Sequence, residues 1–148
     1  MSLLADLAGL KSVFVDTAPV IYLIEAHPEY GQIARNIFEP ILRGALVGYS
    51  SVLILTEVLP KPLQKGDTVV VNEFMEFLLR SRCLNLIEIT APIAERAGRL
   101  RGRYAHLKAL DALQISAALE IGADAFITND KQLKQVSEIK ILFLSDYL

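Results

Sequence analysis

Apolar residues in this chain fall into short runs that are separated by longer segments of helical periodicity. Within the runs, consecutive positions are apolar, which is typical of strands buried on both faces of a parallel sheet. The predicted strands cover residues 12–15, 45–49, 84–89, 125–128 and 139–144.

The segments between these runs have the period and the end signals of helices. Pro19 falls in a first turn, and Gly122 follows a predicted last turn. A helix capped by Ser50 or Ser51 is expected to run to Leu59 and to end at Pro60. The other predicted helices cover residues 17–25, 28–43, 67–82, 90–101 and 107–121, with a short one after 130. This alternation predicts an α/β fold with a mostly parallel sheet of four or five strands and right-handed crossovers.

Length and composition narrow the class of protein. The chain has 148 residues, 53% of them hydrophobic and 22% charged, which fits one globular domain over residues 1–148 and excludes a disordered chain. Residues 1–11 are the candidate for a flexible or cloning-derived segment. Cys83 is the only cysteine, so an intrachain disulfide and a Cys-rich zinc site are excluded. The longest uncharged run is 13 residues, too short to span a bilayer, and no signal peptide is evident, so we expect a cytoplasmic protein without a membrane partner.

Charge is distributed unevenly along the chain. The net charge is −2, but residues 96–108 contain five basic residues and no acid. This basic strip is either an ordinary solvated helix face or a surface for nucleic-acid phosphates. Its members are Arg96, Arg99, Arg101, Arg103 and Lys108.

Two acidic residues stand where predicted strands end. Asp16 follows residues 12–15 directly, and Asp130 follows residues 125–128 after one intervening residue. Open parallel sheets build their sites at the carboxyl ends of the strands, so the two carboxylates are expected at one edge. The alternative for each is a plain helix N-cap.

Asp111 and Glu57 lie inside predicted helices. At 100° per residue, Asp111 shares an arc with Leu107, Ile115 and Ala118, so it is expected on an apolar stripe, whereas Lys108, Ala112, Ser116 and Glu120 are expected to point the other way. A carboxylate there must be protonated, bound to a cation, or paired in a buried salt bridge or with a loop. Glu57 is the only charged residue between positions 43 and 61, and its alternative is an ordinary exposed position.

Several carboxylates in one place repel one another unless a cation neutralises them. Oxygen-only ligands suit Mg²⁺ or Mn²⁺ rather than zinc. His27 and His106 lie outside these segments and are expected to be ordinary surface or loop residues.

Four segments share their order and spacing with a known family. The most specific is Leu-Lys-x-x-Asp-Ala at residues 107–112, followed by Thr-Asn-Asp at 128–130; the others are residues 13–17 and residues 50–58. In these segments the chain resembles the PIN domain, and especially the single-domain PIN ribonucleases that act as toxins of VapBC-type toxin–antitoxin pairs. Ala18-Pro19 departs from the small polar residue that many members carry there.

The resemblance implies a three-layer α/β/α sandwich and a Mg²⁺- or Mn²⁺-dependent endoribonuclease that acts on an RNA substrate. It also implies a cognate antitoxin and a homodimer, for which apolar residues in 67–82 and 90–100 are a further reason. Asp16 and Asp111 would be direct metal ligands. The implied acidic quartet is Asp16, Glu57, Asp111 and Asp130, supported by Thr17, Thr128 and Asn129. The basic strip would then bind RNA phosphates.

Three other functions remain open at this stage. Residues 13–17 also look like the opening motif of haloacid-dehalogenase phosphatases, but that chemistry needs a second Asp at the position of Ala18. A PIN-fold interaction module without activity would lack one of the four acids. A PIN nuclease in RNA processing, outside a toxin–antitoxin pair, fits the sequence equally well.

Overall fold

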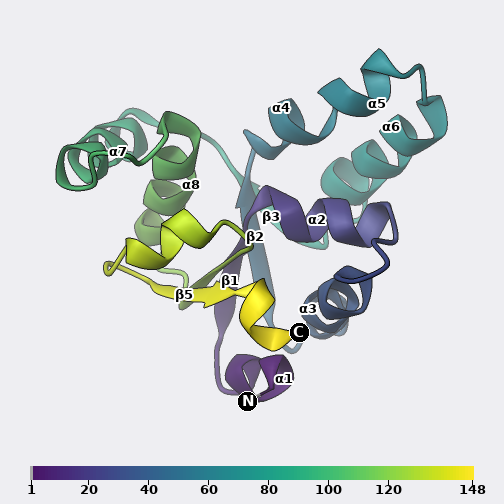
Figure 1. Ribbon diagram of the computed structural model, residues 1–148, viewed down its shortest axis with the longest axis horizontal. Coiled ribbons are helices and arrows are strands. Elements are labelled where there is room, and N and C mark those ends of the chain that lie inside the picture. Colours follow the sequence, from purple (N-terminus) through teal and green to yellow (C-terminus); the bar gives the residue numbers. More distant parts are fainter. Residues whose placement is uncertain (1) are drawn as a thin grey trace.

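The computed structural model describes residues 2–148 and centres on one sheet (Figure 1). All neighbouring strands are parallel, and their order is β3-β2-β1-β4-β5. The strands are β1 (Ser12–Val15), β2 (Val47–Ser51), β3 (Leu84–Ile87), β4 (Ala125–Thr128) and β5 (Lys140–Phe143). The predicted α/β class with a parallel central sheet is therefore confirmed.

Helices cover both faces of the sheet and give the three-layer sandwich. One face carries α1 (Leu3–Leu7), α2 (Thr17–Ile24), α3 (Gly31–Leu42), α4 (Ile54–Val58), α5 (Pro60–Gln64) and α6 (Thr68–Met75), which continues as a π-helix over Glu76–Arg80. The other face carries α7 (Ala91–Arg103) and α8 (Ala109–Glu120) (Figure 1). Short 3₁₀ helices form at Lys131–Gln135 and Leu144–Tyr147.

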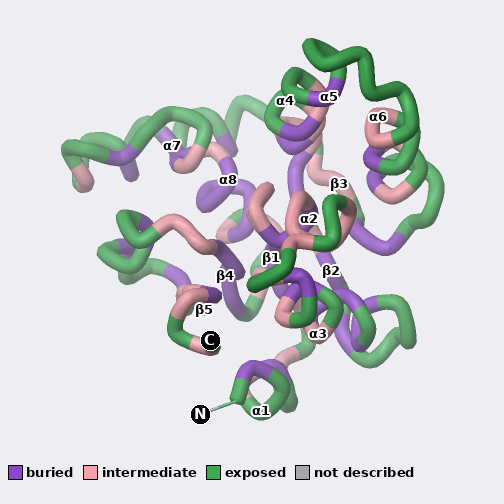
Figure 2. The backbone as a smooth tube through the Cα atoms, turned by 45° about the vertical axis from the view of Figure 1, so that its right-hand side comes forward, coloured by how far each residue is buried: buried purple, intermediate pink, exposed green. Residues whose placement is uncertain are grey.

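The central strands are buried because they face two cores (Figure 2). Alternate residues of a strand point to opposite faces, so Val13 and Val15 join the core under α2 and α3, whereas Phe14 joins the core under α7 and α8. Phe14 stacks on Phe126 of the neighbouring strand at a centroid distance of 5.4 Å. This double burial explains the uninterrupted apolar runs in the sequence.

The second strand lies two residues later than its apolar run predicts. Ser50 and Ser51 are buried strand residues rather than helix caps. The Ser50 hydroxyl donates to the carbonyl of Val15 at 2.8 Å, and the Ser51 hydroxyl donates to Gln114 of α8. Buried hydroxyls are tolerated when they are hydrogen-bonded, and both of these are.

Two further expectations need correction. Pro60 does not end the helical path but begins α5 at its first position, where a proline is well tolerated. Residues 2–11 are not a loose segment, because Leu3 and Leu7 of α1 are buried and Tyr147 donates to Asp6 at 2.6 Å. Met1 lies outside the described residues. None of the helices described is long and apolar enough to cross a membrane.

Candidate active site

Asp16 lies where β1 ends and α2 begins. Its carboxylate accepts from the Thr17 amide at 2.8 Å, as an N-cap does, and its second oxygen accepts from the Thr128 hydroxyl at 2.8 Å. Burial raises the pKa of Asp16 above its usual value. The two hydrogen bonds oppose this rise, whereas the charges of Asp130 and Glu57 add to it. Asp16 is thus the expected helix cap, and its surroundings also disfavour the negative charge of its carboxylate.

The end of β4 supports this carboxylate. Thr128 is fully buried, and its hydroxyl donates to Asp16 while it accepts from the Asp130 amide at 3.0 Å. Asp130 caps the next 3₁₀ helix through the amide of Gln132 at 3.0 Å. Because β1 and β4 are adjacent parallel strands, one hydroxyl joins the turns that carry both aspartates.

Asn129 occupies the turn between these two residues and fixes it to the surrounding structure. Its side-chain amide donates to the Tyr22 hydroxyl of α2 at 2.9 Å. Its carbonyl oxygen accepts from the amide of Ser145 at 3.0 Å and from the hydroxyl of Ser145 at 2.8 Å. Tyr22 and Ser145 were not predicted as supporting residues, since only the tertiary fold brings them to this turn.

Asp111 lies in the first turn of α8 and is partly buried. Among residues 2–148 it has no ion-pair partner, so the alternative of a buried salt bridge is not found. Burial, followed by the charges of Asp16 and Asp130, raises the pKa of Asp111 to about 6, although Lys108 opposes the rise. This carboxylate therefore has an environment that disfavours its own charge.

The faces of α8 differ from the helical-wheel prediction. Ile115 and Ala118 are buried as expected, but Ala112 and Ser116, predicted to point away from the core, are buried as well. The helix is packed between the sheet and α7, and the Ser116 hydroxyl donates to the carbonyl of Ile93 at 2.6 Å. The helical-wheel prediction did not include the burial of Ala112 and Ser116, because α8 has apolar contacts on more than one side.

Glu57 is exposed on α4, which follows β2. Its charge raises the pKa of both Asp16 and Asp111. The four predicted acids therefore form one electrostatic cluster at the carboxyl edge of the sheet, although they come from four different parts of the chain. We call Asp16, Glu57, Asp111 and Asp130 the carboxylate cluster.

The donor set of this cluster suits a hard divalent cation. It offers oxygen ligands alone, and two of its members, Asp16 and Asp111, carry raised pKa values, so a bound cation would relieve the excess negative charge. Within the described residues, no group of three or more His, Cys, Asp or Glu side chains is placed to hold a metal ion. A cation here would be held by one or two of these carboxylates, with water or substrate completing its coordination, as is usual for Mg²⁺.

The basic strip is largely engaged in structural contacts. Arg96 pairs with Glu120 at 3.5 Å, Arg99 with Glu95 at 3.7 Å and Arg103 with Glu138 at 3.3 Å, and Arg101 donates to the carbonyl of Leu107 at 3.2 Å. In the part of the chain that the structure describes, Lys108 is the member whose charge acts on Asp111. The strip therefore does not converge as a whole on the carboxylate cluster.

The two histidines lie outside the carboxylate cluster, as expected. Nδ1 of His27 accepts from the amides of Glu29 and Tyr30, both at 3.1 Å, and so stabilises the loop after α2. His106 is exposed. Both observations agree with ordinary surface or loop roles.

Comparison with known proteins places this geometry in a family. The model of the PIN domain matches residues 13–139, whereas no curated protein matches the chain. Solved structures that share its fold include VapBC2 from Rickettsia felis bound to a promoter DNA fragment (TM-score 0.72, 20% identity, covering 89% of this chain and 98% of that one). Another is VapC20 from Mycobacterium tuberculosis, a toxin that cleaves the sarcin-ricin loop (TM-score 0.65, 18% identity, covering 86% of this chain and 98% of that one). A third is DNA-bound VapBC from Salmonella typhimurium (TM-score 0.62, 17% identity, covering 91% of this chain and 99% of that one). Since the family model spans most of its length, the chain belongs to the PIN domain family.

Proposed function

We propose that this protein is a metal-dependent endoribonuclease and the toxin of a toxin–antitoxin pair. The observation that carries the proposal is the carboxylate cluster, in which four acids meet without a cationic side chain bonded to Asp16 or Asp111 among residues 2–148. Such a cluster costs stability unless it serves a bound cation. Membership of the PIN family and the shared fold with VapC toxins support the same function.

In this proposal the residues divide the work of phosphodiester hydrolysis. Asp16 and Asp111 hold Mg²⁺ or Mn²⁺, which when bound acidifies water and neutralises charge on the scissile phosphate. Thr128 keeps the Asp16 carboxylate oriented through its hydrogen bond. Glu57 and Asp130 hold the attacking water or accept its proton, and the exposure of Glu57 leaves it open to solvent.

The proposed partner is an antitoxin that offers a basic side chain to the cluster. Burial and neighbouring carboxylates raise the pKa of Asp111, and such a concentration of negative charge is a strong anchor for a guanidinium group, which binds carboxylates through two parallel hydrogen bonds. Occupation of the cluster by such a group would exclude both cation and RNA. A complex that retains full nuclease activity would contradict this mode of inhibition.

An RNA cleavage assay tests the enzymatic proposal. The purified chain should cut RNA in Mg²⁺ or Mn²⁺ and stop in EDTA, and Asp16→Asn should reduce the rate by orders of magnitude because a ligand charge is lost. Glu73→Gln, which neutralises an exposed acid on α6, is the matched control and should retain the wild-type rate. Cleavage that persists in EDTA, or that survives Asp16→Asn, would refute the proposal.

The toxin role is tested separately in cells. Expression of the wild-type chain should arrest growth, Asp16→Asn should not, and co-expression of the protein encoded by the neighbouring reading frame should restore growth. An active nuclease whose expression leaves growth unaffected would favour a role in RNA processing instead.

A further inference from the structure

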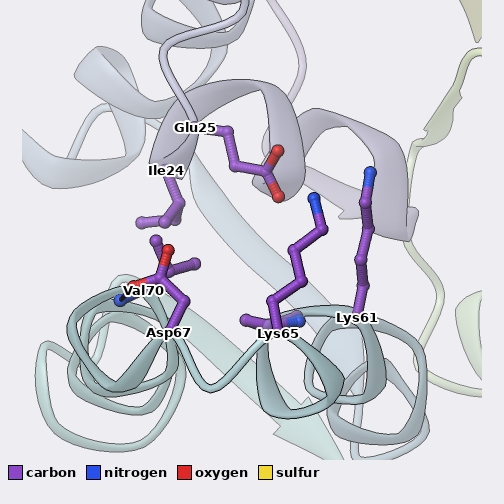
Figure 3. A pocket seen from close by; sticks show the side chains of 7 residues that line it. Ile24, Glu25, Lys61, Lys65, Asp67 and Val70 are labelled. Carbon is purple, nitrogen blue, oxygen red and sulfur yellow. Dashed lines mark hydrogen bonds between the residues drawn. The ribbon is translucent and has the colours of Figure 1, made fainter.

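A cavity of about 290 Å³ lies beside the helices that lead away from the carboxylate cluster. Its lining includes Ile24 and Glu25 at the end of α2, Lys61 and Lys65 from α5 and its C-cap, and Val70 of α6. Figure 3 shows both lysine side chains extending toward α2, and Glu25 reaching toward them. The cavity is therefore open, polar at its mouth and apolar at one wall.

Both walls of this cavity can be traced back to the carboxylate cluster. Helix α2 begins at its cap Asp16 and ends at Ile24. Lys61 and Lys65 follow Glu57 at intervals of four residues, and the amides of Leu59 and Leu63 continue the helical hydrogen bonds through the α4–α5 junction at 3.3 and 3.1 Å. Four helical residues rise about 6 Å and eight rise about 12 Å, so Lys61 and Lys65 lie roughly 6 and 12 Å from Glu57 along the α4–α5 path.

The two lysines are free to bind a ligand. Neither forms an ion pair with any described residue, in contrast to three arginines of the basic strip. Asp67, which also lines the cavity, has its carboxylate engaged with the amide of Val70 at 3.2 Å. Glu25 is exposed and has no ion-pair partner among residues 2–148.

We propose that Lys61 and Lys65 form a phosphate-binding subsite for an RNA strand that leaves the carboxylate cluster between α2 and the α4–α5 helices. This inference rests on the proposed nuclease function. An acidic cluster repels the backbone phosphates on either side of the scissile bond, so a strand needs cations within a few nucleotides of it. At about 3.4 Å per stacked nucleotide, separations of about 6 and 12 Å correspond to about two nucleotides for Lys61 and three or four for Lys65. The lysines, four residues apart on one helix face, are about 6 Å apart along the axis and can contact phosphates about two nucleotides apart.

Substitution of Glu25 distinguishes two roles for the lysines, because each role predicts a different effect on RNA binding and on the melting temperature. If the lysines bind phosphate, the carboxylate of Glu25 repels the same phosphate, so Glu25→Gln should strengthen RNA binding. If the lysines instead serve to pair with Glu25, its neutralisation should lower the melting temperature and leave RNA binding unchanged. Lys140→Ala is the matched control, because Lys140 is exposed at the start of β5 and does not line this cavity.

The experiment is fluorescence anisotropy of a labelled single-stranded RNA about eight nucleotides long, a length typical of single-strand binding sites. All variants carry Asp111→Asn, so that binding is measured without cleavage. We expect Lys61→Ala/Lys65→Ala to weaken binding severalfold and to reduce the slope of log K against log salt by about 0.7 for each lysine removed. The loss should be smaller with an RNA of about two nucleotides, which is too short to reach Lys65 from the cluster.

Three outcomes would overturn the subsite. These are an unchanged salt slope in the double lysine variant, an equal loss in Lys140→Ala, or a weaker affinity after Glu25→Gln. If the lysines instead bind an acidic segment of a protein partner, RNA affinity will not change, which also overturns the proposal. Because binding is read without cleavage, failure of the nuclease proposal and failure of the subsite give different results.

Discussion

The central feature at the scale of residues is the cost in stability of the charged carboxylates of Asp16 and Asp111. Each is partly removed from water and lies near other carboxylates, so each has a raised pKa. Helix capping explains the position of Asp16 but not that of Asp111, which has no ion-pair partner among residues 2–148. The proposed binding of a divalent cation accounts for both.

The raised pKa of Asp111 predicts how stability depends on pH. Its pKa is about 6 in the folded chain and 3.8 for a free side chain, so the folded state binds the proton more tightly between these values. Ionisation then costs stability as pH rises from about 4 to 6. In EDTA, the wild type should gain more stability than Asp111→Asn when the pH is lowered from 7 to 5. Urea unfolding at both pH values measures this difference, and equal changes in the two proteins would contradict it.

Thr128 is predicted to matter through one hydroxyl. Thr128→Val keeps the shape but leaves a buried oxygen of Asp16 without its donor and the Asp130 amide without its acceptor. We expect a loss of about 1–3 kcal/mol in the free energy of unfolding and a lower cleavage rate. Thr128→Ser retains the hydroxyl and is the control. Equal stability of the Val and Ser variants would show that the hydroxyl contributes little.

At the scale of elements, the sequence pattern predicts a strand best where the buried residues of that strand are apolar. Strands β1 and β4 begin and end as predicted, because a run of apolar residues bounded by polar ones leaves little freedom. The predicted position of β2 is two residues too early, because Ser50 and Ser51 are buried polar residues of the strand. The local sequence pattern assigns such residues to a helix cap. Their partners, Val15 and Gln114, are 35 and 63 residues away in sequence. Such long-range hydrogen bonds are invisible to periodicity.

Gly48 provides a prediction at this scale. A Cβ atom at this position of β2 would lie 2.8 Å from Ile41 Cδ1 and 2.8 Å from Leu84 Cδ2. Gly48→Ala should therefore overpack the interface of β2 with α3 and β3, at a cost of about 1–3 kcal/mol. Chemical denaturation measures this cost, and Gly98→Ala, which meets no atom within 4 Å on α7, is the control. A Gly48→Ala variant as stable as wild type would show that the core yields at this point.

At the scale of the molecule, the candidate site depends on topology. The four acids are distributed over 115 positions, from 16 to 130, and only the order of parallel strands brings them to one edge. The meeting of Asp16 and Asp130 follows from the sequence pattern, since both come after predicted strands, whereas Glu57 and Asp111 join the predicted quartet through the resemblance to the PIN domain. The sequence did not allow the pairing of the basic strip to be predicted, because Glu120 and Glu138 reach Arg96 and Arg103 only through tertiary packing.

The predicted homodimer also belongs to this scale. The apolar residues of α7 are buried against α8 and give no reason for pairing. The segment formed by α6 and its π-helical extension differs, because Val69 is 67% exposed and Leu79 is 50% exposed. We expect sedimentation at micromolar concentration to show a dimer and Val69→Glu/Leu79→Glu to shift it toward a monomer. A wild-type species of 16.4 kDa would contradict this prediction.

The melting temperature of wild type and Asp111→Asn, each in EDTA and in Mn²⁺, tests the central claim that the carboxylate cluster binds a divalent cation. Mn²⁺ at about 100 times its Kd should stabilise the wild type by about 2.7 kcal/mol, or roughly 5–10 °C, and should have little effect on Asp111→Asn. In EDTA the variant should melt at or above the wild-type temperature, because one of several mutually repelling charges is gone. An Asp111→Asn protein that melts far below wild type in EDTA, or that gains as much from Mn²⁺, would contradict the metal site.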